Sequence, residues 1–264
     1  MTFTLFSGCS ITAGTGFTEE KNEPGLWVNL LHSQMFSHTT KLNVGLPGRS
    51  NAGIFQDTVK NLLTHQVEYA IVQWTSTARF NIELGFELYD TFQSFIPNAP
   101  CRDHNLNSIN YSAEYLNSIR DRFTTLVHDY YEICNLVEYV NTIIKLAQIT
   151  NTRVFFVNGS GIWDKNFFDK KTNVLPAQYT EYTQQLLNSK NRDDKEVYKL
   201  YEKMHNKYNE LGGINESWWL NLYDSMSNQQ SDTNNDKMHP GPDSNRRYCE
   251  LFSTALIERI NQHQ

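Results

Sequence analysis

The stretch Phe3-Thr4-Leu5-Phe6-Ser7-Gly8-Cys9-Ser10-Ile11-Thr12-Ala13-Gly14 joins a short apolar run to a turn of small residues. Residues 3–6 are rich in aromatic and β-favouring side chains and are bounded by Ser and Gly, a pattern that predicts a buried strand. A small-residue turn directly after a strand lets Ser10 stand clear of the sheet, which a nucleophilic serine requires. Taken alone the string is weak evidence, because serines are common in turns and at helix N-caps.

Three more runs of this kind predict strands at 41–44, 69–74 and 153–158. Between them, apolar residues at helical spacing predict helices over 27–35 and 54–63. Strands that alternate with helices predict an α/β fold, here a three-layer α/β/α sandwich with a mainly parallel central sheet. Ligand sites of such sheets lie at the carboxyl ends of the strands, where each candidate site residue below is found.

The rest of the chain reads as mostly helical. Residues 112–150 contain neither Gly nor Pro, which predicts one long helix or two joined by a tight break. Residues 162–235 read as a helical insertion with helices at 177–188 and 193–211, the second closed by Gly212-Gly213. A last helix is expected from near Ser244, and the whole of 1–264 is expected to form a single domain.

Composition excludes several classes of protein. A net charge of −6 and a pI near 5.8 give no electrostatic case for nucleic acid. No run of 18 apolar residues and no signal-peptide pattern is seen, so we expect a soluble cytoplasmic protein without a membrane span. The four cysteines show no metal spacing and are expected to be buried free thiols: Cys9, Cys101, Cys134 and Cys249.

A second candidate motif, Asp236-Lys237-Met238-His239, precedes the last helix. An Asp three residues ahead of a His in a loop can curl its carboxylate onto Nδ1 of the imidazole. That contact fixes the tautomer and leaves Nε2 free to act as a base. The pair on its own also fits an ordinary solvated loop, and only the combination with Ser10 makes it specific.

Together the two motifs resemble the SGNH/GDSL hydrolases, which carry Gly-Asp-Ser-x-Ser/Thr near the N-terminus and Asp-x-x-His-Pro near the C-terminus. The matches are Gly8-Cys9-Ser10-Ile11-Thr12 and Asp236-Lys237-Met238-His239-Pro240, and Asn43-Val44-Gly45-Leu46-Pro47-Gly48 matches the second block of the family. The resemblance implies a flavodoxin-like fold with Ser10 as nucleophile and with His239 and Asp236 as base and orienter. It further implies that the N–H groups of Ser10 and Gly48 bind the oxyanion.

The chain departs from this family at two places. Cys9 replaces the Asp of Gly-Asp-Ser, which leaves Cys9 open as an alternative nucleophile. In the third block the family carries Gly-x-Asn-Asp, whereas this chain has Trp74-Thr75-Ser76-Thr77-Ala78-Arg79. Ser76 falls at the position of the oxyanion-binding Asn. Arg79 and Trp74 are candidates for substrate binding, with the alternative that Arg79 pairs with a carboxylate on the surface.

The resemblance implies an esterase that works through an acyl-enzyme, without a cofactor or a metal. The substrate is expected to be a small molecule or a glycan ester, with a short acyl group on a carbohydrate favoured over a thioester or a lipid ester. A non-catalytic glycan- or protein-binding module on the same fold is the alternative, supported by the altered third block. The oligomeric state stays open.

Overall fold

A four-stranded parallel sheet lies at the centre of the computed structural model, in the order β2-β1-β3-β8. The strands are β1 Phe3–Ser7, β2 Thr40–Asn43, β3 Val67–Trp74 and β8 Arg153–Asn158. The structure describes residues 1–75, 80–83, 92–95, 104–106, 109–114, 117, 129–159, 199, 206–207, 210–212, 215–221 and 225–262.

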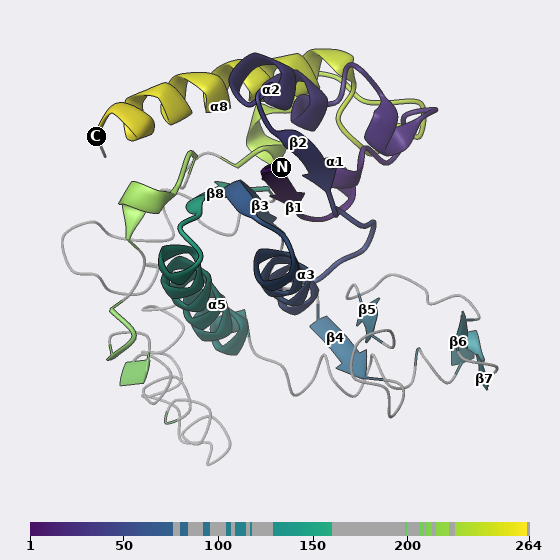
Figure 1. The fold of residues 1–264 in the computed structure, drawn as a ribbon. Coiled ribbons are helices and arrows are strands. Elements are labelled where there is room, and N and C mark those ends of the chain that lie inside the picture. Colours follow the sequence, from purple (N-terminus) through teal and green to yellow (C-terminus); the bar gives the residue numbers. More distant parts are fainter. Residues whose placement is uncertain are drawn as a thin grey trace.

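Helices cover both faces of this sheet (Figure 1). α2 (Trp27–Met35) packs beside α8 (Pro242–Gln262) on one face, and α3 (Asn51–Thr64) packs beside α5 (Asp129–Ile149) on the other. The expected three-layer α/β/α sandwich with a parallel central sheet is therefore confirmed.

Successive side chains of the strands pack into two separate hydrophobic cores, one on each face of the sheet. On β8, Val154 and Phe156 join the cluster under α3 and α5, whereas Phe155 and Val157 join the cluster under α2 and α8. A strand buried on both faces has no polar alternation, which is why the sequence shows continuous apolar runs. The four central strands were predictable from these runs to within two residues at each end.

The strand order β2-β1-β3-β8 has a topological switch point between β1 and β3. The chain runs from β1 outward to β2, and then returns to place β3 on the other side of β1. The connections leaving β1 and β3 therefore diverge to opposite sides, and in open α/β sheets ligands bind at this point. The short helix α1 (Ser10–Ala13), which begins with Ser10, follows β1 there.

Several elements differ from expectation or add to it. The last helix begins at Pro242, two residues before Ser244, because a proline at the first helical position loses no hydrogen bond. Two antiparallel ribbons were not expected: β4 (Phe80–Glu83) with β5 (Phe92–Phe95), and β6 (His104–Leu106) with β7 (Ile109–Tyr111). Short 3-10 turns occur at Glu20–Asn22, Glu216–Trp218 and Ser227–Gln229.

Part of the expected insertion lies outside the described residues. Residues 160–198 are not described, so the helix expected at 177–188 is untested. Of the helix expected at 193–211, residues 199, 206–207 and 210 are described as helical, and Leu211 is described in a turn. Gly212 follows with φ +81°, the left-handed conformation of a C-cap glycine. Cys9, Cys134 and Cys249 are buried free thiols, and Cys101 lies outside the described residues. Within the described part of the chain, no helix has the length and apolar character needed to cross a membrane.

Candidate active site

Ser10 is the first residue of α1, at the carboxyl end of β1. The residue is 6% exposed, and its Oγ donates a weak hydrogen bond to Cys9 Sγ at 3.9 Å. Its backbone N–H, at the start of the helix, donates to no described group, as is usual for the first N–H groups of a helix. The nucleophile expected from the sequence therefore stands beside a free backbone donor.

Gln73, a buried residue of β3, supports this turn from below. Its Oε1 accepts hydrogen bonds from Cys9 N at 3.2 Å and from Thr12 Oγ1 at 2.8 Å. Its Nε2 donates to the carbonyl of Trp74 at 2.9 Å, so both ends of the amide are used. A fully paired amide in the core fixes the position of the turn relative to β3. Sequence reasoning missed Gln73; a polar residue inside an otherwise apolar strand was the available sign.

The contacts of Cys9 with Gln73 also decide between Cys9 and Ser10 as the candidate nucleophile. The thiol is 2% exposed and lies 3.4 Å from both Oε1 and Nε2 of Gln73. Its side chain is thus directed into the support beneath the turn, whereas Ser10 begins the helix above it. The geometry favours Ser10 over Cys9.

Asp236 and His239 meet in a tight loop before α8. Asp236 Oδ2 lies 2.5 Å from His239 Nδ1, and Asp236 Oδ1 accepts from the backbone N–H groups of Met238 and His239 at 3.0 Å each. The backbone hydrogen bond from Asn234 N to His239 O, at 2.8 Å, closes the loop at its base. Because the carboxylate holds Nδ1, the other ring nitrogen, Nε2, is the one left for acid–base chemistry.

These contacts keep Asp236 ionised. Burial alone raises the pKa of the carboxyl, but the hydrogen bonds from His239 N, Met238 N and the imidazole outweigh it and lower the pKa of Asp236 to about 2. A carboxylate charged at all ordinary pH values stabilises the imidazolium that a general base forms during catalysis.

The loop packs against the segment that follows Ser10, although the two are more than 220 residues apart in sequence. A Cβ placed on Gly16 would lie 3.0 Å from both Cγ and Oδ2 of Asp236, so the backbone of Gly16 touches the carboxylate. Gly16 also has φ +94°, which suits glycine alone. The fold thus brings the Asp236–His239 loop against the segment that follows the Ser10 motif. No hydrogen bond joins Ser10 to His239, both of which are described.

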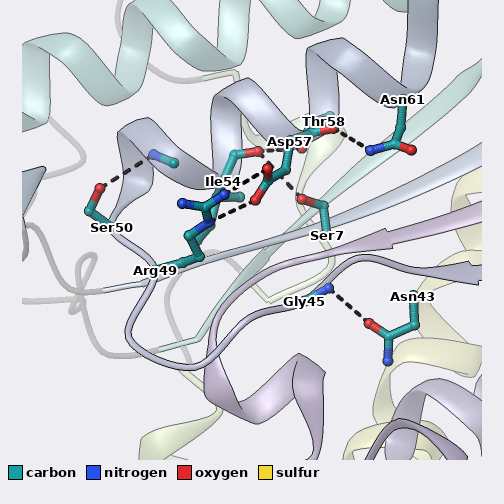
Figure 2. Close-up of polar contacts among 10 residues, drawn as sticks. Ser7, Asn43, Gly45, Arg49, Ser50, Ile54, Asp57, Thr58 and Asn61 are labelled. Carbon is teal, nitrogen blue, oxygen red and sulfur yellow. Dashed lines mark hydrogen bonds and ion pairs between the residues drawn. The ribbon is translucent and has the colours of Figure 1, made fainter. Parts of the chain in front are cut away.

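The loop between β2 and α3, which carries Gly48, is hydrogen-bonded at both of its ends; Figure 2 shows these bonds at Asn43 and Gly45 and at Arg49 and Ser50. Asn43 Oδ1 accepts from Gly45 N at 3.0 Å, and Arg49 makes two hydrogen bonds with Asp57 of α3, at 2.8 and 2.9 Å. Ser50 caps α3 through Gly53 N at 3.3 Å. These hydrogen bonds anchor the loop at both ends.

Two further hydrogen bonds tie the loop to the nucleophile turn. Asn43 Nδ2 donates to Thr12 O at 2.9 Å, and Leu46 N donates to Gly8 O at 3.1 Å. Gly48 itself has φ +75°, and its N–H donates to no group in the described part of the chain. The second backbone donor expected from the sequence is therefore free and lies on a fixed loop.

The third block is described only as far as Thr75. Asn51, buried in the first turn of α3, pairs with this residue twice: Nδ2 donates to Thr75 O at 3.0 Å, and Oδ1 accepts from Thr75 N at 2.9 Å. Ser76 and Arg79 lie outside the described residues. Trp74, a candidate for substrate binding, is instead completely buried and stacks on Phe156 with ring centroids 5.9 Å apart, so its side chain belongs to the core.

Among the residues that the structure describes, no group of three or more His, Cys, Asp or Glu side chains is placed to hold a metal ion. The groups described at the candidate site are a serine hydroxyl, an imidazole held by a carboxylate, and the backbone N–H groups of Ser10 and Gly48.

Comparison with known proteins finds similarity in structure only. No protein-family model matches the chain, and no curated protein matches it in sequence. The structure of TesA matches at 12% identity with a TM-score of 0.46, over 98% of this chain and 99% of its own. The esterase EstA from Pseudoalteromonas sp., solved inhibited by monoethylphosphonate, matches at 10% identity with a TM-score of 0.47, over 98% of each chain. A carbohydrate acetylesterase family member from Sinorhizobium meliloti matches at 11% identity with a TM-score of 0.45, over 99% of this chain and 100% of its own. Identities and scores of this size assign no activity, which has to be argued from the site itself.

Proposed function

We propose that this chain is a serine hydrolase of the SGNH/GDSL kind that cleaves an ester through an acyl-enzyme intermediate. The observation that carries the proposal is the Asp236–His239 contact, held against the backbone of Gly16 just beyond Ser10. A loop that served only as a solvated connection would not need an imidazole held through Nδ1 and a carboxylate packed against Gly16, in the segment that follows the strand-end serine.

In the proposed mechanism, Ser10 Oγ attacks the ester carbonyl while His239 Nε2 takes its proton. The imidazolium is stabilised by Asp236, and it then gives the proton to the departing alcohol. Water, activated by the same imidazole, attacks the acyl-enzyme and releases the acid. The resting hydrogen bond of Ser10 Oγ to Cys9 Sγ, at 3.9 Å, is long and weak, so its loss costs little when the hydroxyl turns to donate to His239 in the proposed mechanism.

The N–H groups of Ser10 and Gly48 are the proposed oxyanion donors. Both donate to no described group, and preorganised donors cost no rearrangement when the negative charge develops. Ser76 is the proposed third donor, in place of the Asn of the family, and Arg79 is the competing candidate. The proposed substrate is a short acyl ester, with an O-acetyl group on a carbohydrate favoured over a thioester or a lipid ester.

A fluorophosphonate probe tests this proposal without knowledge of the substrate. The probe should label the protein once, and mass spectrometry of the digested protein should place the label on Ser10. The Ser10→Ala variant is the control and should not be labelled. A wild-type protein that is correctly folded but unlabelled would favour the alternative, a glycan- or protein-binding module on this fold.

A further inference from the structure

Asn245, in the first turn of α8, makes three hydrogen bonds to parts of the chain that flank the site. Its Nδ2 donates to Pro240 O at 3.1 Å and to Gly241 O at 2.9 Å, the two carbonyls that directly follow His239. Its Oδ1 accepts from Trp27 N at 3.0 Å. The residue is 1% exposed, and both ends of its amide are paired inside the protein.

Trp27 continues this connection to the nucleophile. It is the first residue of α2, and the preceding Leu26 provides no side-chain cap, so the Trp27 N–H would be unpaired without Asn245. The indole Nε1 of Trp27 donates to the carbonyl of Ile11 at 3.3 Å, one residue after Ser10. Hydrogen bonds of Asn245 and Trp27 therefore connect the backbone after His239 to the backbone beside Ser10.

We propose that Asn245 is a positioning residue, which sets the distance between His239 and Ser10 by joining the backbone after His239 to α1 through Trp27. The inference rests on the proposed function. Asp236 contacts Gly16 ahead of His239 in the loop, and Asn245 binds the two carbonyls that follow His239. His239 therefore lies between two points at which the loop is attached to the rest of the protein.

The backbone positions matter because the side chains of Ser10 and His239 are not hydrogen-bonded to each other. Ser10 Oγ and His239 share no hydrogen bond, so their alignment depends on the elements that carry them. A displacement of about 1 Å between reacting groups lowers a rate on the order of a hundredfold. Loss of the Asn245 contacts should therefore reduce the rate of attack by Ser10 and leave the affinity for the reagent unchanged.

Two variants of the full-length protein test this. Asn245→Asp keeps an oxygen for Trp27 N but places the other oxygen against the carbonyls of Pro240 and Gly241. We expect its maximal rate of labelling by the fluorophosphonate probe to fall by roughly ten- to a hundredfold, with half-saturation at the same probe concentration. Trp27→Phe removes the bond to Ile11 O together with part of a buried ring that packs against Phe6 and Phe252, and its labelling rate should fall by up to about tenfold.

Ser253→Ala is the matched control. Ser253 is itself buried and also joins α8 to α2, through a part-buried hydrogen bond from its Oγ to Gln34 Oε1 at 3.1 Å, but it lies two turns further along α8. Urea unfolding gives the loss of stability of each variant, so that labelling is compared only where the variants are folded; under those conditions only the control should label within about twofold of wild type. The rise of the labelling rate with pH should keep its shape in the Asn245 and Trp27 variants, because His239 itself remains.

Wild-type rates in both variants would overturn the inference and leave the proposed function intact. Equal slowing in all three variants would also overturn it, since that result reflects general stability. If Asn245→Asp does not fold, the test rests on Trp27→Phe: a labelling rate below that of wild type supports the inference, and a wild-type rate overturns it. Absence of any labelling in the folded wild type would reject the proposed function, and the inference with it.

Discussion

At the scale of the residue, Ser10 and Cys9 are neighbours with opposite environments. Cys9 is directed at the amide of Gln73, while Ser10 begins α1 with a free N–H. Ser10→Ala should lower ester turnover by on the order of a thousandfold or more with little change in stability. Cys9→Ala should keep most of the activity. Hydrolysis of a p-nitrophenyl ester measures both, and an active Ser10→Ala beside an inactive Cys9→Ala would reverse the assignment.

His239 should give the reaction its pH dependence. A general base works in its neutral form, so turnover should rise with pH as the imidazole loses its proton. Replacement of His239 by Ala should remove this rise and most of the rate. The measurement is a profile of kcat/KM against pH for both proteins. An unchanged profile at the wild-type rate would exclude His239 from the mechanism.

Ser76 and Arg79 compete for the place of the missing Asn donor. Loss of one preorganised oxyanion donor lowers turnover by about a hundred- to a thousandfold. We expect this loss, in kcat rather than in KM, for Ser76→Ala, with Arg79→Ala nearly silent. The reverse pattern on the same acetyl ester would assign the donor to Arg79. Full activity in both variants would leave the backbone N–H groups of Ser10 and Gly48 as the whole oxyanion hole.

At the scale of the element, the loop between β2 and α3 is fixed at several points and bears a glycine in a left-handed conformation. A side chain at Gly48 would meet nothing within 4 Å, so only its φ of +75° opposes substitution. Gly212 offers a matched control, with φ +81° and equally open surroundings, in a turn apart from the proposed site.

Gly48→Ala and Gly212→Ala should therefore each destabilise the fold by about 1–2 kcal/mol, the cost of a left-handed L-residue. Only Gly48→Ala should also lower turnover, because relief of the strain shifts the N–H at residue 48. Urea unfolding and ester hydrolysis, measured on both variants, separate the two effects. Equal turnover in the two variants would remove the Gly48 N–H from the oxyanion hole.

At the scale of the whole molecule, two aspartates hold the C-terminal helix and its preceding loop. Asp232 accepts from the N–H groups of Asp243 and Ser244, at 3.0 and 2.7 Å, and so caps α8. Burial raises the pKa of Asp232, but the hydrogen bonds from Ser244 and Asp243 outweigh it and lower that pKa. Asp236 has a pKa of about 2 for the corresponding reasons.

Acid should therefore weaken the fold through these two groups. Because their folded pKa values lie below the ordinary value of 3.8, the unfolded chain binds protons first as the pH falls. The stabilisation is complete above about pH 4 to 5 and is lost toward pH 2. Asp232→Asn and Asp236→Asn should each have a lower free energy of unfolding than wild type, measured with urea. This difference from wild type should be smaller at pH 3 than at pH 6. Ser253→Ala, which alters no titrating group, should keep a constant difference from wild type; constant differences in the Asn variants would contradict the prediction.

The sequence by itself determined the α/β architecture, the four central strands and the helices between them. These follow from local periodicity: strands buried on both faces must be continuously apolar, and helices that cover a sheet must have an apolar side. The Asp236-to-His239 spacing is equally local, and their contact lies within one loop.

Only the tertiary structure decided which polar residues support the site. Gln73, Asn51 and Asn245 act across separations of 61, 24 and 218 residues in their respective contacts with Thr12, Thr75 and Trp27. Trp74 was a candidate for substrate binding from the sequence, but its buried ring stacks on Phe156 in the core. Such roles depend on which segments the fold brings together, and a local pattern carries no information about a partner so far along the chain.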